Sequence, residues 1–279
     1  MCAVLLRPSS STPPLDTSSD MTSMAGILNN LVFLSRTRNL LYITDTNALV
    51  PTRKFEHLSC FFPGLLALGV STLSDAIMSP KDRELHMWAA EGLAHTCWVM
   101  YADQPSGLGP EIVLFDGVLH GEGHPGYPTS DFSEEKWMWH IERWEQNGRP
   151  GGKPPGVGDA GQPLNDHEDV KMDYEIWTSD YLLRPEVCAC IFHLCYFAVL
   201  TRLQTLESMF IMYRTTKDVK WRERGWQIWE AIESKTRTAS GYASVHGVNA
   251  VHPPPSDSMP RCVAFNRCVT VSTRSFTAE

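Results

Sequence analysis

Residues 205–232 read Thr205-Leu-Glu-Ser-Met-Phe-Ile-Met-Tyr-Arg-Thr-Thr-Lys-Asp-Val-Lys-Trp-Arg-Glu-Arg-Gly-Trp-Gln-Ile-Trp-Glu-Ala-Ile232 and predict two helices joined by a tight turn. Asp218 is a favourable N-cap, because its carboxylate can accept a hydrogen bond from a free N–H of the first turn. After it, residues of one helical face recur at intervals of about three or four: Trp221, Gly225, Ile228, Trp229 and Ile232. The stretch therefore predicts a helical hairpin.

Further helices are expected around His57 and over residues 82–101, with short extended segments at 29–34 and 40–44. Helical hairpins build solenoids, tetratricopeptide-like arrays and α/α barrels. No fixed-period repeat favours the first two architectures. We therefore expect an all-α fold with minor β-hairpins, in which the Gly- and Pro-rich residues 147–165 form a long surface loop.

A motif directly before the hairpin is divided by an apolar segment. Residues 181–186 read Tyr-Leu-Leu-Arg-Pro-Glu, and they would join the hairpin stretch if residues 187–204 were removed. Glu186 and Glu207 would then lie three residues apart on one helical face, close to Arg184. Such a group can tune a carboxylate for base chemistry, orient a water or lie behind a cation. The spacing alone equally fits an ordinary helix start, where acidic residues are favoured by the helix dipole.

Three more segments of the chain have distinctive residue patterns. Residues 54–69 read Lys-Phe-Glu-His-Leu-Ser-Cys-Phe-Phe-Pro-Gly-Leu-Leu-Ala-Leu-Gly, and residues 96–101 read Thr-Cys-Trp-Val-Met-Tyr. Gly-Leu-Gly-Pro-Glu follows at residues 107–111. In this order, the three segments and the rejoined motif resemble glycoside hydrolase family 47, the class I α-1,2-mannosidases.

The resemblance implies a fold and a reaction. It implies that residues 24–260 form part of an (α/α)7 barrel, of which this chain would supply about the second half. The implied activity is removal of terminal α-1,2-linked mannose from oligomannose N-glycans, by an inverting route with Ca²⁺ as cofactor. An inverting hydrolase needs a carboxylic acid and a carboxylate base roughly 6.5–9.5 Å apart, and Ca²⁺ prefers oxygen ligands.

The resemblance also assigns roles to single residues. Glu186 would be the catalytic carboxylate that acts as the base, and Arg184 would orient it or the sugar. The positions that would line the substrate site or the water shell of the calcium are His57, Glu111 and Glu207. Without the resemblance, a buried structural histidine is the commoner interpretation of His57.

Cysteine usage indicates the compartment. The resemblance implies a disulfide between Cys60 and Cys97, which points to the secretory pathway, that is, the endoplasmic reticulum or Golgi. Two buried free thiols are the alternative. The other cysteines are Cys2, Cys188, Cys190, Cys195, Cys262 and Cys268. None of them shows convincing zinc-site spacing.

Some parts of the chain depart from the family pattern. The family's N-terminal half has no counterpart here, and the family threonine that binds calcium is absent, because residues 261–279 follow another pattern. We therefore expect this polypeptide to be inactive by itself. The alternative function is a noncatalytic homologue that binds mannose glycans or serves glycoprotein quality control.

Residues 187–204 are interpreted as an aberrant insertion. Val187 needs a codon beginning with GT, Gln204 can be encoded by CAG, and the segment has a whole number of codons, as an intron read in frame would. A genuine inserted loop is the alternative. Residues 1–23 are expected to be a disordered leader, since they hold few large apolar groups, and they contain no targeting segment. A net charge of −8 without a basic stripe argues against nucleic acid as a partner.

Overall fold

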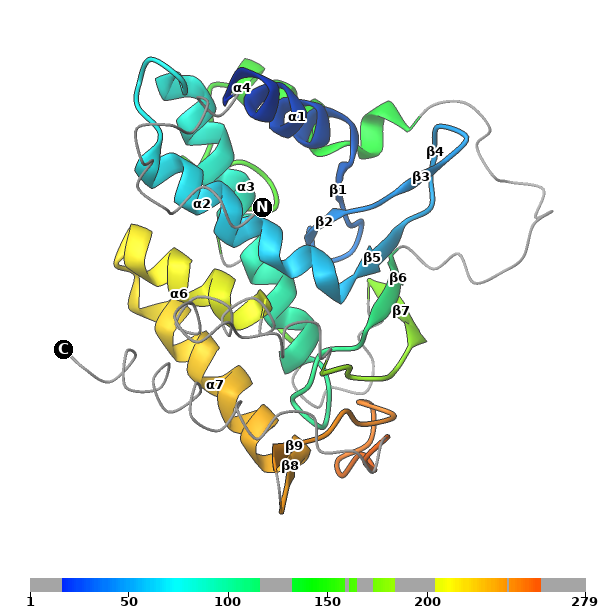
Figure 1. The fold of residues 1–279 in the computed structure, drawn as a ribbon. Helices are drawn as coiled ribbons and strands as arrows, with labels where there is room; N and C mark the ends of the chain where they lie inside the picture. Colours follow the sequence, from blue (N-terminus) through cyan, green and yellow to red (C-terminus); the bar gives the residue numbers. More distant parts are fainter. Residues whose placement is uncertain are drawn as a thin grey trace, which may run out of the picture.

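The computed structural model describes residues 17–115, 132–158, 161–164, 173–183, 204–239 and 241–256. These residues are mostly helical, with a few short strands, which confirms the predicted class (Figure 1). The α-helices are α1 (Thr17–Asn30), α2 (Phe62–Thr72), α3 (Pro80–Ala102), α4 (Trp137–Gln146), α6 (Gln204–Thr216) and α7 (Val219–Thr236). Two 3₁₀ helices are also described, η2 (His57–Phe61) and η3 (Ser133–Glu135).

The strands form small antiparallel sheets, most of them at one side of the helices (Figure 1). β1 (Val32–Leu34) pairs with β2 (Leu41–Ile43), and β3 (Thr46–Asn47) pairs with β4 (Val50–Pro51). A three-stranded sheet has the order β5 (Lys54–Glu56), β6 (Ile112–Phe115) and β7 (Tyr174–Thr178). β8 (Arg237–Thr238) and β9 (Gly241–Tyr242) form a hairpin after α7.

The helices pack as consecutive pairs. α2 packs on α3 and α6 packs on α7, and α6 also lies against α2 and α3 (Figure 1). Asp218 caps α7, because its carboxylate accepts a hydrogen bond from the Lys220 N–H at 3.1 Å. Lys217 takes a positive φ of 59° in the turn. The predicted helical hairpin is therefore confirmed, including its cap.

The prediction of a disordered leader is wrong for residues 17–23, because α1 begins at Thr17. Residues 1–16 lie outside the described part of the chain. Low-propensity serines and threonines occupy this helix, but Leu28 is fully buried, and Met24 and Ile27 pack against the same core. Burial of these side chains one turn apart stabilises a helix that composition alone does not predict.

The predicted surface loop also packs more closely than expected. Its described residues have no regular structure, but Pro154, Gly156 and Val157 are buried. The indole N–H of Trp137 donates to the Pro155 carbonyl at 2.9 Å. A Cβ on Gly92 of α3 would lie only 2.5 Å from the Gly156 carbonyl oxygen. A glycine in the middle of α3 thus lets the loop cross directly over the helix.

We expect Gly92→Ala to lower the free energy of unfolding by about 1–3 kcal/mol, because the added methyl meets backbone and must displace it. The matched control is Gly26→Ala in α1, where a Cβ would meet nothing within 4 Å. Alanine's better helix propensity should make that control neutral or stabilising by up to about 1 kcal/mol. Urea unfolding measures both effects. Equal changes in the free energy of unfolding for the two variants would contradict the close approach of the loop to α3 at Gly92.

Among the described residues, no helix has the length and apolar character that a membrane-spanning segment requires.

Candidate functional site

The candidate site lies at one end of the three-stranded sheet, where η2 begins. The His57 N–H donates to the Glu111 carbonyl at 2.9 Å. The Glu111 N–H in turn donates to the carbonyl oxygens of Thr178, at 3.1 Å, and Asp180, at 2.9 Å. Both His57 and Glu111 are buried. Backbone pairing at the sheet end therefore brings two predicted site residues together with the chain that leaves β7.

Two cross-links run side by side between η2 and α3. The first is the predicted disulfide, which joins Cys60 to Cys97. The second is a hydrogen bond of 2.5 Å between His57 Nε2 and the Tyr101 hydroxyl. Cys97 and Tyr101 lie one turn apart on α3, and His57 and Cys60 lie one turn apart on η2, so each pair shares a face. The disulfide thus fixes the register in which His57 meets Tyr101.

The two described ends of the divided motif converge on His57. On one side, the Tyr181 ring lies edge-on to the His57 ring, with centroids 5.8 Å apart. On the other, the Thr205 hydroxyl of α6 lies 3.3 Å from His57 Nε2. Tyr181 is held there by a backbone bridge to Val245. Arg184 and Glu186 lie outside the described residues, but the chain on both sides of them contacts the same imidazole.

Ser208 fixes the first turn of α6. Its hydroxyl donates to the Cys60 carbonyl at 2.5 Å and accepts from the Gly64 N–H at 3.0 Å. A Cβ on Gly64 would lie 2.8 Å from that hydroxyl oxygen. Glycine is therefore required for this close approach of α2 and α6. The contact sets the position of Glu207, the adjacent residue in the same turn.

Glu207 is half-buried, and burial raises the pKa of its carboxyl from 4.5 to about 7. None of the described residues provides an opposing charge that contributes to this shift. A carboxyl with such a pKa is partly protonated near neutral pH, so it can exchange a proton or bind a nearby cation. The role that the resemblance gives Glu207 in the site stays a prediction.

This pKa predicts a pH-dependent stability. Because the folded-state pKa is raised, the favourable contribution is fully present below about pH 4.5 and is lost as the pH rises through about 7. Glu207→Gln resembles the protonated form of the side chain. Its free energy of unfolding should equal that of wild type at low pH and should be higher than that of wild type by up to about 3 kcal/mol at pH 8. Urea unfolding across this pH range tests the expectation, with the exposed Glu223→Gln as control. The expectation would be contradicted if the free energies of unfolding of wild type and Glu207→Gln differed by the same amount at every pH.

The tyrosines next to His57 are held as neutral phenols. Burial raises the pKa of Tyr101 to about 12, although hydrogen bonding with Thr205 and Tyr181 opposes the shift. Burial also raises the pKa of Tyr181 well above its ordinary value. Both hydroxyls therefore keep their protons at physiological pH and act only through hydrogen bonds.

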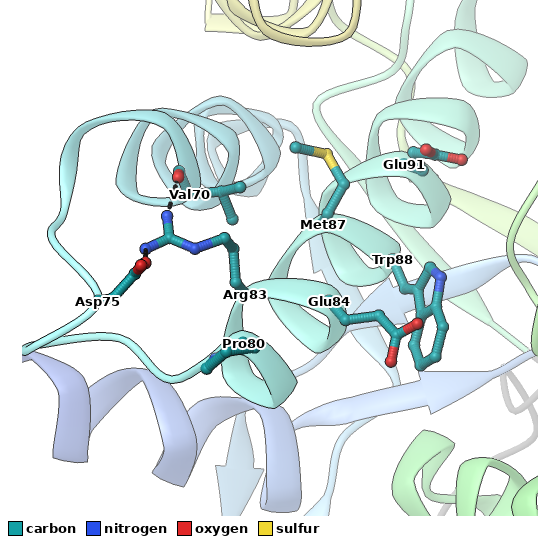
Figure 2. A pocket seen from close by; sticks show the side chains of 8 residues that line it. All are labelled: Val70, Asp75, Pro80, Arg83, Glu84, Met87, Trp88 and Glu91. Atoms are coloured by element: carbon teal, nitrogen blue, oxygen red, sulfur yellow. Dashed lines mark hydrogen bonds and ion pairs between the residues drawn. The ribbon is translucent and has the colours of Figure 1, made fainter.

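A separate cavity of about 530 Å³ lies between the end of α2 and the first turns of α3. Figure 2 shows Arg83 pointing across it, with hydrogen bonds to the Val70 carbonyl and, at 2.8 Å, to Asp75. Trp88 and Met87 line its other side. None of the predicted site residues lines this cavity. It is therefore separate from the site around His57.

The described residues contain no group of three or more His, Cys, Asp or Glu side chains that could hold a metal ion. The sequence motifs pointed to His57, Glu111, Glu207 and the disulfide, but they gave no role to the hydroxyl groups around the imidazole. Those groups belong to Tyr101, Tyr181 and Thr205. Each of these residues lies at one end of a motif quoted above. This position is the sequence signal that could have identified them as neighbours of His57.

Comparisons with known proteins identify similar sequences. The sequence profile of glycosyl hydrolase family 47 matches residues 17–263. Mannosyl-oligosaccharide 1,2-alpha-mannosidase MNS3 of Arabidopsis thaliana is 32% identical over 216 residues, which cover 74% of this chain and 26% of that protein. The endoplasmic reticulum mannosyl-oligosaccharide 1,2-alpha-mannosidase of Rattus norvegicus is 30% identical over 241 residues, which cover 85% of this chain and 25% of that protein.

A solved structure is similar in fold. The alpha-1,2-mannosidase from Trichoderma reesei superposes with a TM-score of 0.53 at 21% identity, covering 86% of this chain and 37% of that one. The present chain spans about a quarter of the length of the curated relatives named above.

Proposed function

Because the chain belongs to glycosyl hydrolase family 47, we propose that it functions in the removal of terminal α-1,2-linked mannose from oligomannose N-glycans. The observation that carries this proposal is the convergence of both ends of the divided motif on His57. Tyr181 and Thr205 reach this ring from segments before and after residues 184–203. The predicted catalytic pair, Arg184 and Glu186, lies within that interval.

In the proposed fold, the helical pairs are parts of an (α/α)7 barrel. The consecutive packing of α2 on α3 and of α6 on α7 supports this architecture, since such barrels are built from helical hairpins. The fold similarity to a solved α-1,2-mannosidase supports it as well. The site around His57 would then lie inside the barrel.

In the proposed reaction, inversion requires an acid that protonates the leaving oxygen and a base that activates water. Glu186 is the proposed base, with Arg184 orienting it or the sugar. His57, Glu111 and Glu207 would position the substrate and the water molecules around it. The half-buried carboxyl of Glu207 supports this role, because it is not neutralised by a salt bridge within the described residues.

The proposed cofactor is Ca²⁺, which takes six to eight oxygen ligands. The described residues do not fit a complete calcium site, because no cluster of three possible ligand side chains occurs among them. Glu207 and Glu111 would face the hydration shell of the ion. We therefore assign no reaction step to it.

The proposed location is the secretory pathway, in the endoplasmic reticulum or Golgi. The Cys60–Cys97 disulfide supports it, because disulfides persist in oxidising compartments. The proposed partners are oligomannose glycans on glycoproteins.

We propose that residues 1–279, expressed alone, release no mannose, because they correspond to about a quarter of the relatives' length. The decisive test is therefore a chimera, in which residues 24–260 replace the matching segment of the Arabidopsis relative. It is made with and without residues 187–204, and its folding is checked by circular dichroism.

The chimera without residues 187–204 should release mannose from an oligomannose N-glycan, and both a calcium chelator and Glu186→Gln should abolish release. A folded chimera without release would overturn the proposed hydrolysis. If that chimera captures the glycan without calcium and never cleaves it, the noncatalytic binding function replaces the proposal. Mannose release by residues 1–279 alone would overturn the proposed inactivity.

A further inference from the structure

Strand β7, at the outer edge of the three-stranded sheet, carries an exposed aromatic side chain at an irregular point (Figure 1). On β6, Ile112 pairs with Thr178. The next residue, Val113, pairs with Ile176, so Trp177 has no opposite residue and forms a β-bulge. Trp177 is 62% exposed, which makes it the most exposed aromatic residue of the described chain. Bulges are common beside active sites, where they redirect a side chain.

The fold makes little use of this indole. Trp177 is not part of the buried core, and none of the described residues forms a hydrogen bond or ring contact with its side chain. By contrast, Trp226, the next most exposed tryptophan at 38%, donates its indole N–H to Glu230 at 2.8 Å. The Trp177 ring is therefore available to a ligand, and its removal should cost little stability.

Trp177 lies beside the site around His57. The carbonyl of the following residue, Thr178, accepts from the Glu111 N–H at 3.1 Å, and the Glu111 carbonyl accepts from the His57 N–H at 2.9 Å. Since consecutive Cα atoms are about 3.8 Å apart, the Trp177 backbone lies within about 10 Å of that of Glu111. Glu111 and His57 are buried. The bulge therefore brings an exposed ring next to a buried group of candidate site residues.

The segment after the bulge also carries polar groups that suit sugar hydroxyls. Asp180, three residues after Trp177, forms a hydrogen bond of 2.7 Å with His246 Nδ1. Both side chains are partly exposed. A carboxylate has enough lone pairs to accept from a ligand hydroxyl while it keeps this bond. A pyranose presents C–H groups on one face and hydroxyls at its rim, so an indole face with a carboxylate in the same segment suits it.

The proposed substrate supplies the occupant of this surface. An oligomannose N-glycan is branched, and a hydrolase that removes a terminal mannose binds only the two units of the cleaved bond at its reacting centre. The other units lie outside that centre, against the surface that borders it. Contacts with such remote parts of a substrate contribute binding energy. Trp177 is an exposed aromatic residue on this border.

We propose that Trp177 is a specificity-determining residue, whose indole face packs against a mannose unit beyond the two that the cleaved bond joins. This inference rests on the proposed function, because the ligand is the glycan of that reaction. The contact takes no part in bond cleavage, so it stabilises the bound substrate and the transition state equally. Such a contact lowers KM and leaves kcat unchanged.

The first test is NMR of the full chain with ¹⁵N-labelled tryptophan, in which Trp177→Phe and Trp226→Phe assign two indole signals. Millimolar oligomannose N-glycan should shift the Trp177 indole N–H signal and leave the Trp226 signal unchanged. A linear glucan of similar size is the control ligand and should shift neither. An unchanged Trp177 signal would overturn the proposal, as would an equal shift with the glucan, which would show unspecific stacking only.

The second test uses the chimera without residues 187–204. Trp177→Ala should raise KM for an oligomannose N-glycan about tenfold without changing kcat. Hydrolysis of the disaccharide α-1,2-mannobiose should not change, because it has no third unit. Trp177→Phe keeps a flat ring and should lose less, and the matched control Trp226→Ala should affect neither substrate. Equal losses on both substrates, or no loss on either, would overturn the proposal.

The two tests separate this inference from the proposed function. If the chimera cleaves both substrates and Trp177→Ala alters neither, Trp177 is not a glycan contact and the proposed function stands. If the folded chimera releases no mannose but oligomannose shifts the Trp177 signal, the proposed hydrolysis fails and the glycan contact stands. A Trp177 signal that shifts with protein concentration in the absence of glycan would assign the indole to a contact between copies of the chain and overturn the proposal.

Discussion

Asp173→Asn should lower the free energy of unfolding by about 3–5 kcal/mol, because it removes one of the two carboxylates that pair with a buried guanidinium and leaves the Arg38 Nε–H without a charged acceptor. The Asp173 side chain is fully buried and forms an ion pair with Arg38, whose side chain is 8% exposed. One carboxylate oxygen also accepts from the backbone N–H of Arg38 at 2.7 Å and from the Ser35 hydroxyl at 3.0 Å. Asparagine keeps the shape but removes the charge and one acceptor oxygen.

The second carboxylate in this cluster already has other partners and does not compensate. Asp103 pairs with Arg38 at 2.9 Å and also accepts from the Tyr174 hydroxyl at 2.8 Å. Burial alone would lower the pKa of Arg38, but hydrogen bonds and charges of the two carboxylates raise it well above its ordinary value. Arg38 therefore stays charged in every variant.

The control is the same chemical change at an exposed ion pair. Asp75 pairs with Arg83 at 2.8 Å, but its side chain is 86% exposed, so Asp75→Asn should cost at most about 1 kcal/mol. Both variants are compared with wild type by urea unfolding monitored by circular dichroism. If Asp173→Asn costs no more than this control, the buried cluster is not a major source of stability.

Cys60→Ala/Cys97→Ala should lower the free energy of unfolding by about 4 kcal/mol, the entropy that a cross-link of this span removes from the unfolded chain. The two cysteines are 37 residues apart in sequence. After the change, the His57–Tyr101 hydrogen bond is the remaining side-chain link between η2 and α3 described above. We therefore also expect the His57 NMR signals to broaden.

Thiol reductant provides the matched comparison for this prediction. Reductant present during urea unfolding should bring wild type close to the stability of the double variant, because the cross-link then no longer restricts the unfolded chain. The double variant itself should not respond. A response of similar size in both proteins would show that the effect does not come from the Cys60–Cys97 cross-link.

Features that depend on local sequence were predictable. The α6–α7 hairpin followed from the Asp218 cap and from apolar spacing, both of which act within a few residues. The first part of α1 was not predicted from the sequence, because the stability of this helix comes from the packing of Leu28 and its neighbours and not from the helix propensity of its residues. The Arg38–Asp173 pair spans 135 residues, and neither residue carries a local signal of its partner.

The site was predictable in its motif residues and unpredictable in its hydrogen-bonding partners. The resemblance gave His57 as a candidate site residue, and it gave the Cys60–Cys97 disulfide, which is present in the structure. The partner of His57 follows only from the geometry of two helices, since the face of α3 that carries Cys97 also carries Tyr101. The roles of Arg184 and Glu186 stay predictions, because these residues lie outside the described part of the chain.

The meeting of Tyr181 and Thr205 at one ring has a consequence for how the two halves of the motif are held together. Both residues contact His57, so their separation in space is limited by this shared partner and not by the number of residues between them in sequence. Their placement around His57 is therefore expected to be the same with and without residues 187–204.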